Sequence, residues 1–305
     1  MSNLVAEITM FNSNLLSKIA YIFLIVPIIG FCEAYSSGKD LAQAVYDRHS
    51  PDDSSAKVQM LLSKKGTVKK RRLLFSYGLD KGNSERWSLM RFIQPKDVDG
   101  TGLLSKDYLG DDNDQWLYLP SSDKVRRISS KRKGGRFVGS DFYYEDLRDR
   151  EVNMDTHKLL GQGKAGSVGC LLLESIPVKK SNSVYTRRLS CIHPKILIPL
   201  WTEFYKKKEK PVKRLKAKRI KKVQGYWTVF ESTMSNLKSG NATQLITLNI
   251  TYNQDIPESL FTQRGLEDQS LEVPFRPKGK VSNRKKSSSA AAVKPAKKSS
   301  EMEGQ

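Results

Sequence analysis

The sequence predicts an α+β fold that is mainly β, in which one long antiparallel sheet curls into a barrel or part of a barrel. About ten short runs that mix β-branched, aromatic and polar residues follow one another at hairpin spacing. Helical periodicity is largely confined to one segment ahead of these runs. Hydrophobic residues make up 38% of the chain and aromatic residues 9%, which is enough to bury a core.

Residues 38–48 form the predicted helix, because Leu41, Ala44 and Val45 fall on one face at helical spacing. The predicted strands come next, with turn chemistry such as Gly66 between or beside them. These strands cover residues 58–62, 67–77, 85–94, 115–119, 124–129, 171–176, 185–192, 197–205, 212–220, 226–233 and 244–252.

Residues 1–34 have the layout of a secretory signal peptide. Lys18 supplies a positive flank, residues 19–31 are an unbroken apolar run, and Ala34 ends a Cys-Glu-Ala cleavage motif. The run of about 13 residues is shorter than the roughly 20 that cross a bilayer as a helix. We therefore expect cleavage after Ala34 and secretion, with an uncleaved N-terminal membrane anchor as the alternative.

Cleavage after Ala34 would leave two cysteines, Cys170 and Cys191. In an oxidising compartment this pair can form a disulfide, and two buried free thiols are the other possibility. The three histidines lack metal-ligand spacing with these cysteines. No metal site is therefore expected.

The formal net charge of +21 is concentrated in two segments. Residues 206–222 carry a net charge of +10 and residues 276–305 carry +7. The first is expected to be a hairpin with a solvated Lys/Arg face, or else a docking surface for anionic lipid headgroups or an acidic partner. The second is rich in Lys, Ser, Ala and Pro and is expected to be a disordered tail that attracts polyanions without a specific nucleic-acid partner.

The catalytic signatures in the chain lack their required context. Residues 161–166 (GQGKAG) resemble a phosphate-binding glycine loop, but a strand rather than a helix is expected after them. Kinase HRD and DFG motifs are absent from the sequence, as is the nucleophile elbow GxSxG. We therefore expect a protein that is not an enzyme, needs no cofactor, and has only a flexible glycine loop at 161–166.

The most specific signal is the block from residue 94 to 147. It contains a Pro-Lys-Asp-Val-Asp-Gly-Thr turn (95–101), a Trp-x-Tyr-x-Pro strand (116–120) and a Val-Arg-Arg-Ile segment (125–128). It ends with Phe-x-Gly-Ser-Asp-Phe (137–142) and Tyr-Glu-Asp-Leu (144–147). This block closely resembles the family of outer-membrane lipoprotein-sorting proteins, relatives of the periplasmic lipoprotein carrier LolA. Weaker similarity extends over most of residues 38–270.

The resemblance implies a LolA/LolB-like fold: an incomplete, half-open antiparallel β-barrel with a few covering helices and an apolar cavity between them. It implies a domain at residues 35–275 that carries a lipid or lipoprotein acyl chain through the periplasm. It also implies a partner, an inner-membrane transporter of the resistance-nodulation-division type. Apolar burial at about 25 cal/mol per Å² would hold such a cargo without chemistry.

Several aromatic and aliphatic side chains are candidates for the lining of this cavity, with ordinary core packing as the alternative. Trp87 and Leu89 alternate on one strand and Trp116 and Tyr118 on another, so each pair projects to one face. The full set of candidates is Trp87, Leu89, Trp116, Tyr118, Phe137 and Phe142.

The family block also holds polar residues with a structural role or a role at the cavity rim. Arg126, Arg127 and Arg136, with Asp141 and Asp146, could form ion pairs in either setting. The complete signature set is Arg126, Arg127, Gly139, Ser140, Asp141 and Asp146.

Two other functions are compatible with the sequence. The same fold could serve an envelope-stress sensor that binds mislocalised lipoprotein and signals to a membrane partner. Alternatively, residues 206–222 and the tail could make a polyanion-binding protein, whose binding would fall steeply with salt. In both cases no covalent chemistry is expected.

Overall fold

The computed structural model describes residues 35–110, 113–207 and 209–277. The predicted signal peptide lies outside these residues, and so does nearly all of the predicted tail. The domain boundaries proposed at residues 34 and 275 therefore stay predictions.

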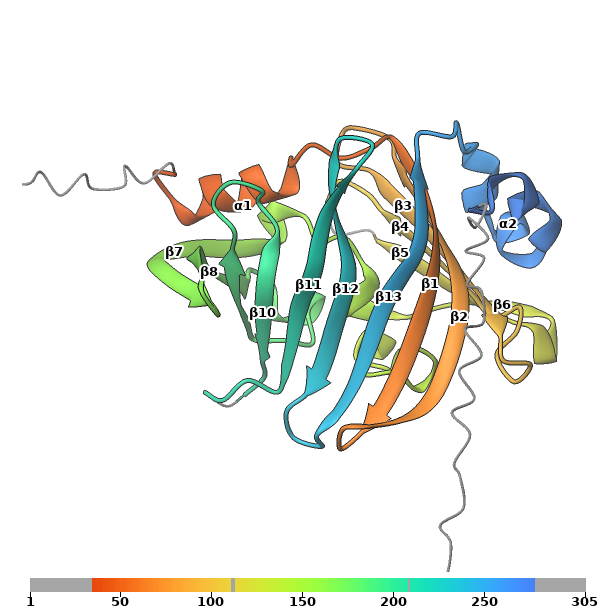
Figure 1. The fold of residues 1–305 in the computed structure, drawn as a ribbon, viewed down its shortest axis with the longest axis horizontal. Helices are drawn as coiled ribbons and strands as arrows, with labels where there is room; N and C mark the ends of the chain where they lie inside the picture. Colours follow the sequence, from red (N-terminus) through yellow and green to blue (C-terminus); the bar gives the residue numbers. More distant parts are fainter. Residues whose placement is uncertain (1–34, 111–112, 208, 278–305) are drawn as a thin grey trace, which may run out of the picture. The chain divides into compact units, whose positions relative to one another are not determined.

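One antiparallel sheet dominates the described residues and contains 13 strands (Figure 1). Its first half is an antiparallel meander whose strands follow chain order. The bounds of these strands are β1 (Asp53–Lys64), β2 (Thr67–Asp80), β3 (Arg86–Gln94), β4 (Gly102–Asp107), β5 (Asp114–Leu119) and β6 (Lys124–Arg127).

The second half of the sheet is a similar meander. Its strands are β7 (Asp155–Ala165), β8 (Val168–Pro177), β9 (Arg187–Ile192), β10 (Pro199–Tyr205), β11 (Lys213–Val223), β12 (Tyr226–Asn236) and β13 (Asn241–Tyr252). The first and last strands of the sheet in sequence, β1 and β13, pair with each other and join the two halves. The strand order ends at β6 and β7, so the sheet stays open. The expectation of a mainly β, half-open barrel is confirmed.

Two strands were missed by the sequence analysis. β4 is a short, largely buried strand of six residues, and β7 includes the glycine-rich stretch that was expected to be a flexible loop. Within β7 the pairing to β8 shifts register between Leu159 and Gln162, and the turn to β8 follows at Gly166. The glycines therefore serve a bulged strand and its hairpin turn, which corrects the loop prediction.

The helix α1 (Gly38–Tyr46) confirms the predicted N-terminal helix. Ser37 caps it by accepting a hydrogen bond from the backbone N–H of Asp40 at 3.1 Å. A Cβ atom at Gly38 would come within 2.7 Å of the β7 backbone, so only glycine allows α1 to begin this close to the sheet. Leu41 and Ala42 pack on β8 and β9, so Ala42 rather than the predicted Ala44 completes the apolar face.

The two faces of the sheet pack against different parts of the chain. The central segment, residues 128–154, connects β6 to β7 and packs on the inner face around Phe137 and Phe142. The C-terminal segment, residues 253–277, includes α2 (Gln263–Glu267) and packs on the outer face of β2–β5. Because both faces are covered there, β2 and β3 bury side chains on both faces of the sheet, at odd-numbered and at even-numbered positions.

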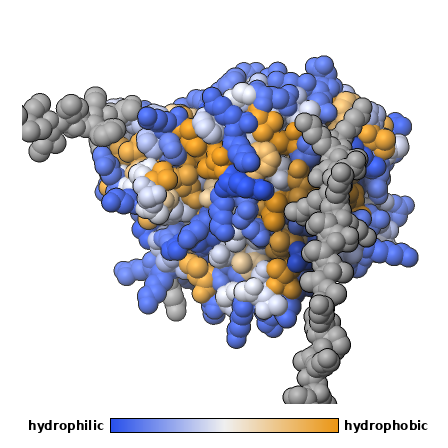
Figure 2. Space-filling model, viewed as in Figure 1, coloured by the Kyte–Doolittle hydropathy of each residue, from blue (hydrophilic) through white to orange (hydrophobic). Residues whose placement is uncertain are grey.

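The part of the outer face shown in Figure 2 is mixed in character. Hydrophilic side chains run along β11 and β12, with apolar side chains on either side. No helix among residues 35–110, 113–207 and 209–277 is long and apolar enough to cross a membrane.

Candidate binding site

A cavity of about 760 Å³ lies between α1, the end of the central segment and the inner face of the sheet. Its volume is within the range of roughly 300–1,000 Å³ that is typical of small-molecule sites. Much of its wall is apolar. Apolar residues of the wall are Ala42, Val45, Leu79, Val152, Leu173, Ile192, Leu197, Ile198, Leu215, Ala217 and Val229.

The wall also holds uncharged polar residues and charged residues, and its acidic groups are matched by donors within the fold. Arg86 bonds both Asp80 at 3.2 Å and Asp149 at 2.6 Å. Asp155 receives two hydrogen bonds of 2.8 Å from Arg150 and lies 3.4 Å from Arg188. These three carboxylates of the cavity wall are therefore paired with arginines and are not free charges.

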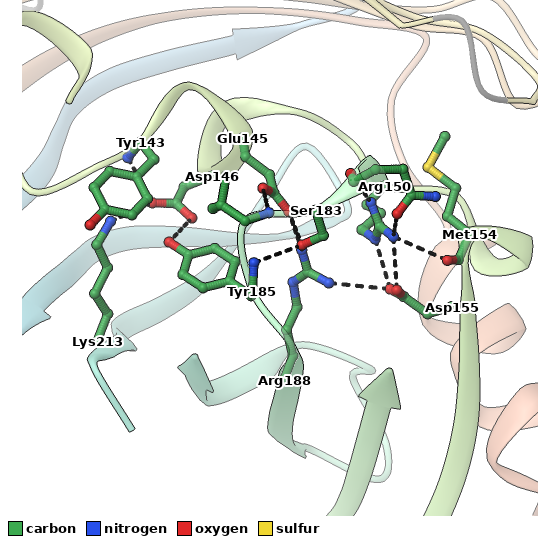
Figure 3. Close-up of polar contacts among 12 residues, drawn as sticks. Tyr143, Glu145, Asp146, Arg150, Met154, Asp155, Ser183, Tyr185, Arg188 and Lys213 are labelled. Carbon is green, nitrogen blue, oxygen red and sulfur yellow. Dashed lines mark hydrogen bonds and ion pairs between the residues drawn. The ribbon is translucent and has the colours of Figure 1, made fainter. Parts of the chain in front are cut away.

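The central segment is fastened to the sheet by Asp146 (Figure 3). Its carboxylate pairs with the Lys213 ammonium at 3.0 Å and accepts a hydrogen bond from the Tyr185 hydroxyl at 2.7 Å. It also accepts the backbone N–H of Tyr143 at 2.7 Å. Both charged side chains of the pair are 2% exposed. Burial lowers the pKa of Lys213, and burial also raises the pKa of Tyr185.

A second carboxylate of the central segment, Glu145, binds a different strand of the sheet (Figure 3). It pairs with Arg188 of β9, and it accepts the backbone N–H of Val184 at 2.7 Å and the hydroxyl of Ser183. Arg188 also contacts Asp155, so it links the central segment to the start of β7. The predicted signature Tyr-Glu-Asp-Leu is therefore an anchor that holds the central segment on the inner face.

The other signature residues do not form the single polar network that was considered for the rim. Arg136 lies 3.4 Å from Asp141, and Thr243 of β13 donates its hydroxyl to Asp141 at 2.9 Å. Arg127 instead pairs with Asp114 on β5, and Arg126 is exposed on β6. Arg127 and Arg136 therefore form separate ion pairs rather than one network, and the role of the signature residues stays a prediction.

Gly139 and Ser140 shape the turn between the two phenylalanines of the signature. Gly139 has a φ angle of +72°, a conformation that side chains disfavour. Ser140 Oγ accepts the backbone N–H of Phe142 at 3.2 Å. Phe137 and Phe142 are thereby turned into the inner core, where both are nearly fully buried.

Of the six side chains predicted as cavity lining, Trp87 alone borders the cavity described above. Leu89, Trp116 and Tyr118 lie with it in the outer cluster under the C-terminal segment. Phe137 and Phe142 fill the inner face with the central segment. The pairs predicted to share a face do so, on the face covered by the C-terminal segment, and Trp87 of the β3 pair also reaches the cavity. Contact of these residues with a lipid stays a prediction.

Sequence reasoning missed most of the cavity wall. Arg48, Arg86, Arg150 and Arg188 are scattered over 140 residues, and each follows or belongs to a different element. The one available signal was the apolar face of α1, which packs on β8 and β9 beside the cavity. Within the described part of the chain, no group of three His, Cys, Asp or Glu side chains could hold a metal ion.

Cys170 and Cys191 form a disulfide between β8 and β9, with their Cα atoms 5.4 Å apart. The bond closes a loop of 21 residues, which in the chain-entropy model stabilises a fold by about 3 kcal/mol. We expect the double variant Cys170→Ala and Cys191→Ala to lose about this much unfolding free energy in urea titrations. A reductant should destabilise the unaltered protein and leave the variant unchanged; equal sensitivity of both would contradict the bond.

The fold of this chain recurs in solved structures. An outer membrane lipoprotein-sorting protein domain from Vibrio parahaemolyticus is 32% identical, with a TM-score of 0.72 over 76% of this chain and 98% of that one. The chain belongs to the outer-membrane lipoprotein-sorting protein family. A DUF1329 family protein from Desulfovibrio piger is 30% identical, with a TM-score of 0.71 over 75% of this chain and 97% of that one.

The same fold also occurs at lower sequence identity. A LolA superfamily protein from Nitrosomonas europaea has a TM-score of 0.59 at 19% identity, over 76% of this chain and 100% of that one, and therefore shares the fold. A family model described as "Uncharacterized protein" matches residues 84–268. No curated protein matches the chain.

Proposed function

We propose that the protein is a periplasmic carrier that holds a lipid, or the acyl chain of a lipoprotein, in the cavity beneath α1. The observation that carries this proposal is the cavity itself, with about 760 Å³ of space and an apolar wall between helix and sheet. Burial of each methylene group is worth about 0.8 kcal/mol, so about ten methylenes would supply roughly 8 kcal/mol. Membership of a lipoprotein-sorting family supports the same cargo class.

The proposed activity is transfer without bond breaking, and the cargo comes from or goes to an inner-membrane transporter. The polar anchors of the central segment support a rigid wall, because Asp146 and Glu145 fix that segment to two different strands. The covering helix α1 is joined to the sheet by a small apolar cluster around Leu41 and Leu173.

A charge placed on the cavity side of α1 should abolish lipid uptake. Val45 lines the cavity, so Val45→Asp would put a carboxylate against the acyl chain, at a cost of several kcal/mol. We expect at least a hundredfold weaker binding of a fluorescent fatty-acyl probe. Ala44→Asp is the matched control, because residue 44 lies on the same helix but not in the cavity wall.

The decisive measurement is native mass spectrometry, with lipid extraction, of protein purified from the periplasm of its own host. A stoichiometric lipid that is lost in Val45→Asp and kept in Ala44→Asp is the expected result. A cargo-free protein that also takes up no offered lipid or lipoprotein would reject the carrier function.

A further inference from the structure

Arg48 is a cation of the cavity wall whose charge is not matched by a carboxylate. It follows the C-terminal end of α1 and is half-buried. One of its guanidinium nitrogens donates to the backbone carbonyl of Trp227, at 3.5 Å. Arg48 has no ion pair with any residue in the described part of the chain.

The acidic groups of the cavity wall already have other donors. Asp80 and Asp149 are bound by Arg86, and Asp155 by Arg150 and Arg188. The remaining acids accept backbone N–H groups. Asp53 accepts those of Gln254 and Ile256, and Glu151 accepts that of Gly110. Arg148, the fifth arginine of the wall, pairs with Asp107 outside it.

The electrostatic surroundings of Arg48 favour an added anion. Burial lowers the pKa of Arg48, and the neighbouring Arg86 acts in the same direction, while Asp149 and Tyr252 oppose it. A guanidinium that has lost part of its hydration without gaining a counter-ion gains more from an anion than an exposed one does.

β11, which is rich in Lys and Arg, forms a hairpin with β12, and the turn end of this hairpin reaches the cavity wall beside Arg48. Arg48 bonds Trp227, and the adjacent His49 ring lies 4.7 Å from that of Tyr226. Across the same hairpin the Lys222 ammonium lies 5.3 Å from the Trp227 ring. The end of the most basic strand is thus beside the cavity, where its positive field would draw in a negatively charged molecule.

We propose that Arg48 binds the anionic headgroup, a phosphate or carboxylate, of the lipid whose acyl chains occupy the cavity. The proposal rests on the carrier function and narrows its cargo from lipids in general to acidic lipids. The planar guanidinium can hold two oxygens of a phosphate at once, while the apolar wall beneath α1 takes the chains.

The test compares two phospholipids with the same acyl chains and the same phosphate: one is a net anion, and the other is a zwitterion whose choline cation offsets the phosphate charge. Delipidated full-chain protein would be titrated with dioctanoyl phosphatidylglycerol and dioctanoyl phosphatidylcholine, and the dissociation constants measured by calorimetry. The unaltered protein should bind the anionic lipid at least tenfold more tightly. Arg48→Gln should bind both lipids equally, and Arg48→Lys should keep part of the preference. Arg126→Gln removes an exposed arginine on β6 and should keep all of it.

The outcomes separate this proposal from the carrier function. If both lipids bind equally to the unaltered protein, or if Arg48→Gln keeps the preference, the headgroup site is rejected and the carrier remains. If neither lipid binds, the carrier function itself fails. A third titration uses inorganic phosphate alone. If phosphate binding requires Arg48 but no lipid binds, the site takes free phosphate and the lipid source is overturned.

Discussion

Arg91→Met should lower the free energy of unfolding by about 3–5 kcal/mol, the usual cost of breaking a buried ion pair. Arg91 and Glu272 are both completely buried, and Arg91 Nε lies 3.5 Å from the Glu272 carboxylate. The guanidinium also donates to the carbonyls of Gly100, Gly265 and Leu266, at 2.7–3.0 Å. The substitution would leave three acceptors and a carboxylate without this donor. Urea unfolding, followed by tryptophan fluorescence, measures the loss.

The comparison variants show whether burial is the cause. Arg127→Met breaks a pair whose arginine side chain is 68% exposed, and should cost less than about 1 kcal/mol. The double variant Arg91→Met with Glu272→Leu should be more stable than the sum of the two single variants predicts, because it removes the buried carboxylate that Arg91→Met leaves with only Arg276 as an ion-pair partner. A loss for Arg91→Met as small as that for Arg127→Met would show that the C-terminal segment does not depend on this pair.

Asp146→Ala should be similarly destabilising, by about 3–5 kcal/mol. The substitution leaves the Lys213 ammonium buried, with its side chain only 2% exposed, and removes the acceptor of the Tyr185 hydroxyl. Chemical unfolding gives the loss, and hydrogen exchange of the central segment should rise in the same variant because its anchor to β11 is gone.

Two controls belong with Asp146→Ala. Lys218 lies on β11, as Lys213 does, but its side chain is 56% exposed and pairs with Glu231 of β12. Removing this partner in Glu231→Ala should cost about 1 kcal/mol. Lys213→Met added to Asp146→Ala should restore part of the stability. If the double variant is no more stable than Asp146→Ala, the buried lysine charge is not the source of the loss.

Alternation along single strands made much of the sheet predictable. Residues two apart project to one face, so Trp87 with Leu89 and Trp116 with Tyr118 could be paired correctly from sequence. The same alternation does not say what covers that face. The central segment covers one face of β2–β5 and the C-terminal segment covers the other. Apolar side chains therefore point to both faces of these strands, and alternation alone does not identify the cover.

The strands missed by sequence analysis show where local signals fail. In β7, glycines at 161 and 163 are typical of a loop, yet pairing with β8 holds this stretch in a bulged strand. A Cβ atom at Gly163 would lie 2.6 Å from Leu172, so the glycine is there to admit a neighbouring side chain. That requirement exists only once β7 and β8 are side by side.

The amino-acid sequence alone was sufficient for the family, the mainly β class and the N-terminal helix, because periodicity and a contiguous motif block are local properties. Tertiary structure decided the disulfide, the role of Asp146 and the position of the cavity. Each of these depends on side chains from distant parts of the chain, such as Arg48 and Trp227, 179 residues apart. Pairing of β1 with β13 joins the two meanders and brings together residues that are far apart in the sequence. The spacing of these residues along the chain does not indicate that they are close in space.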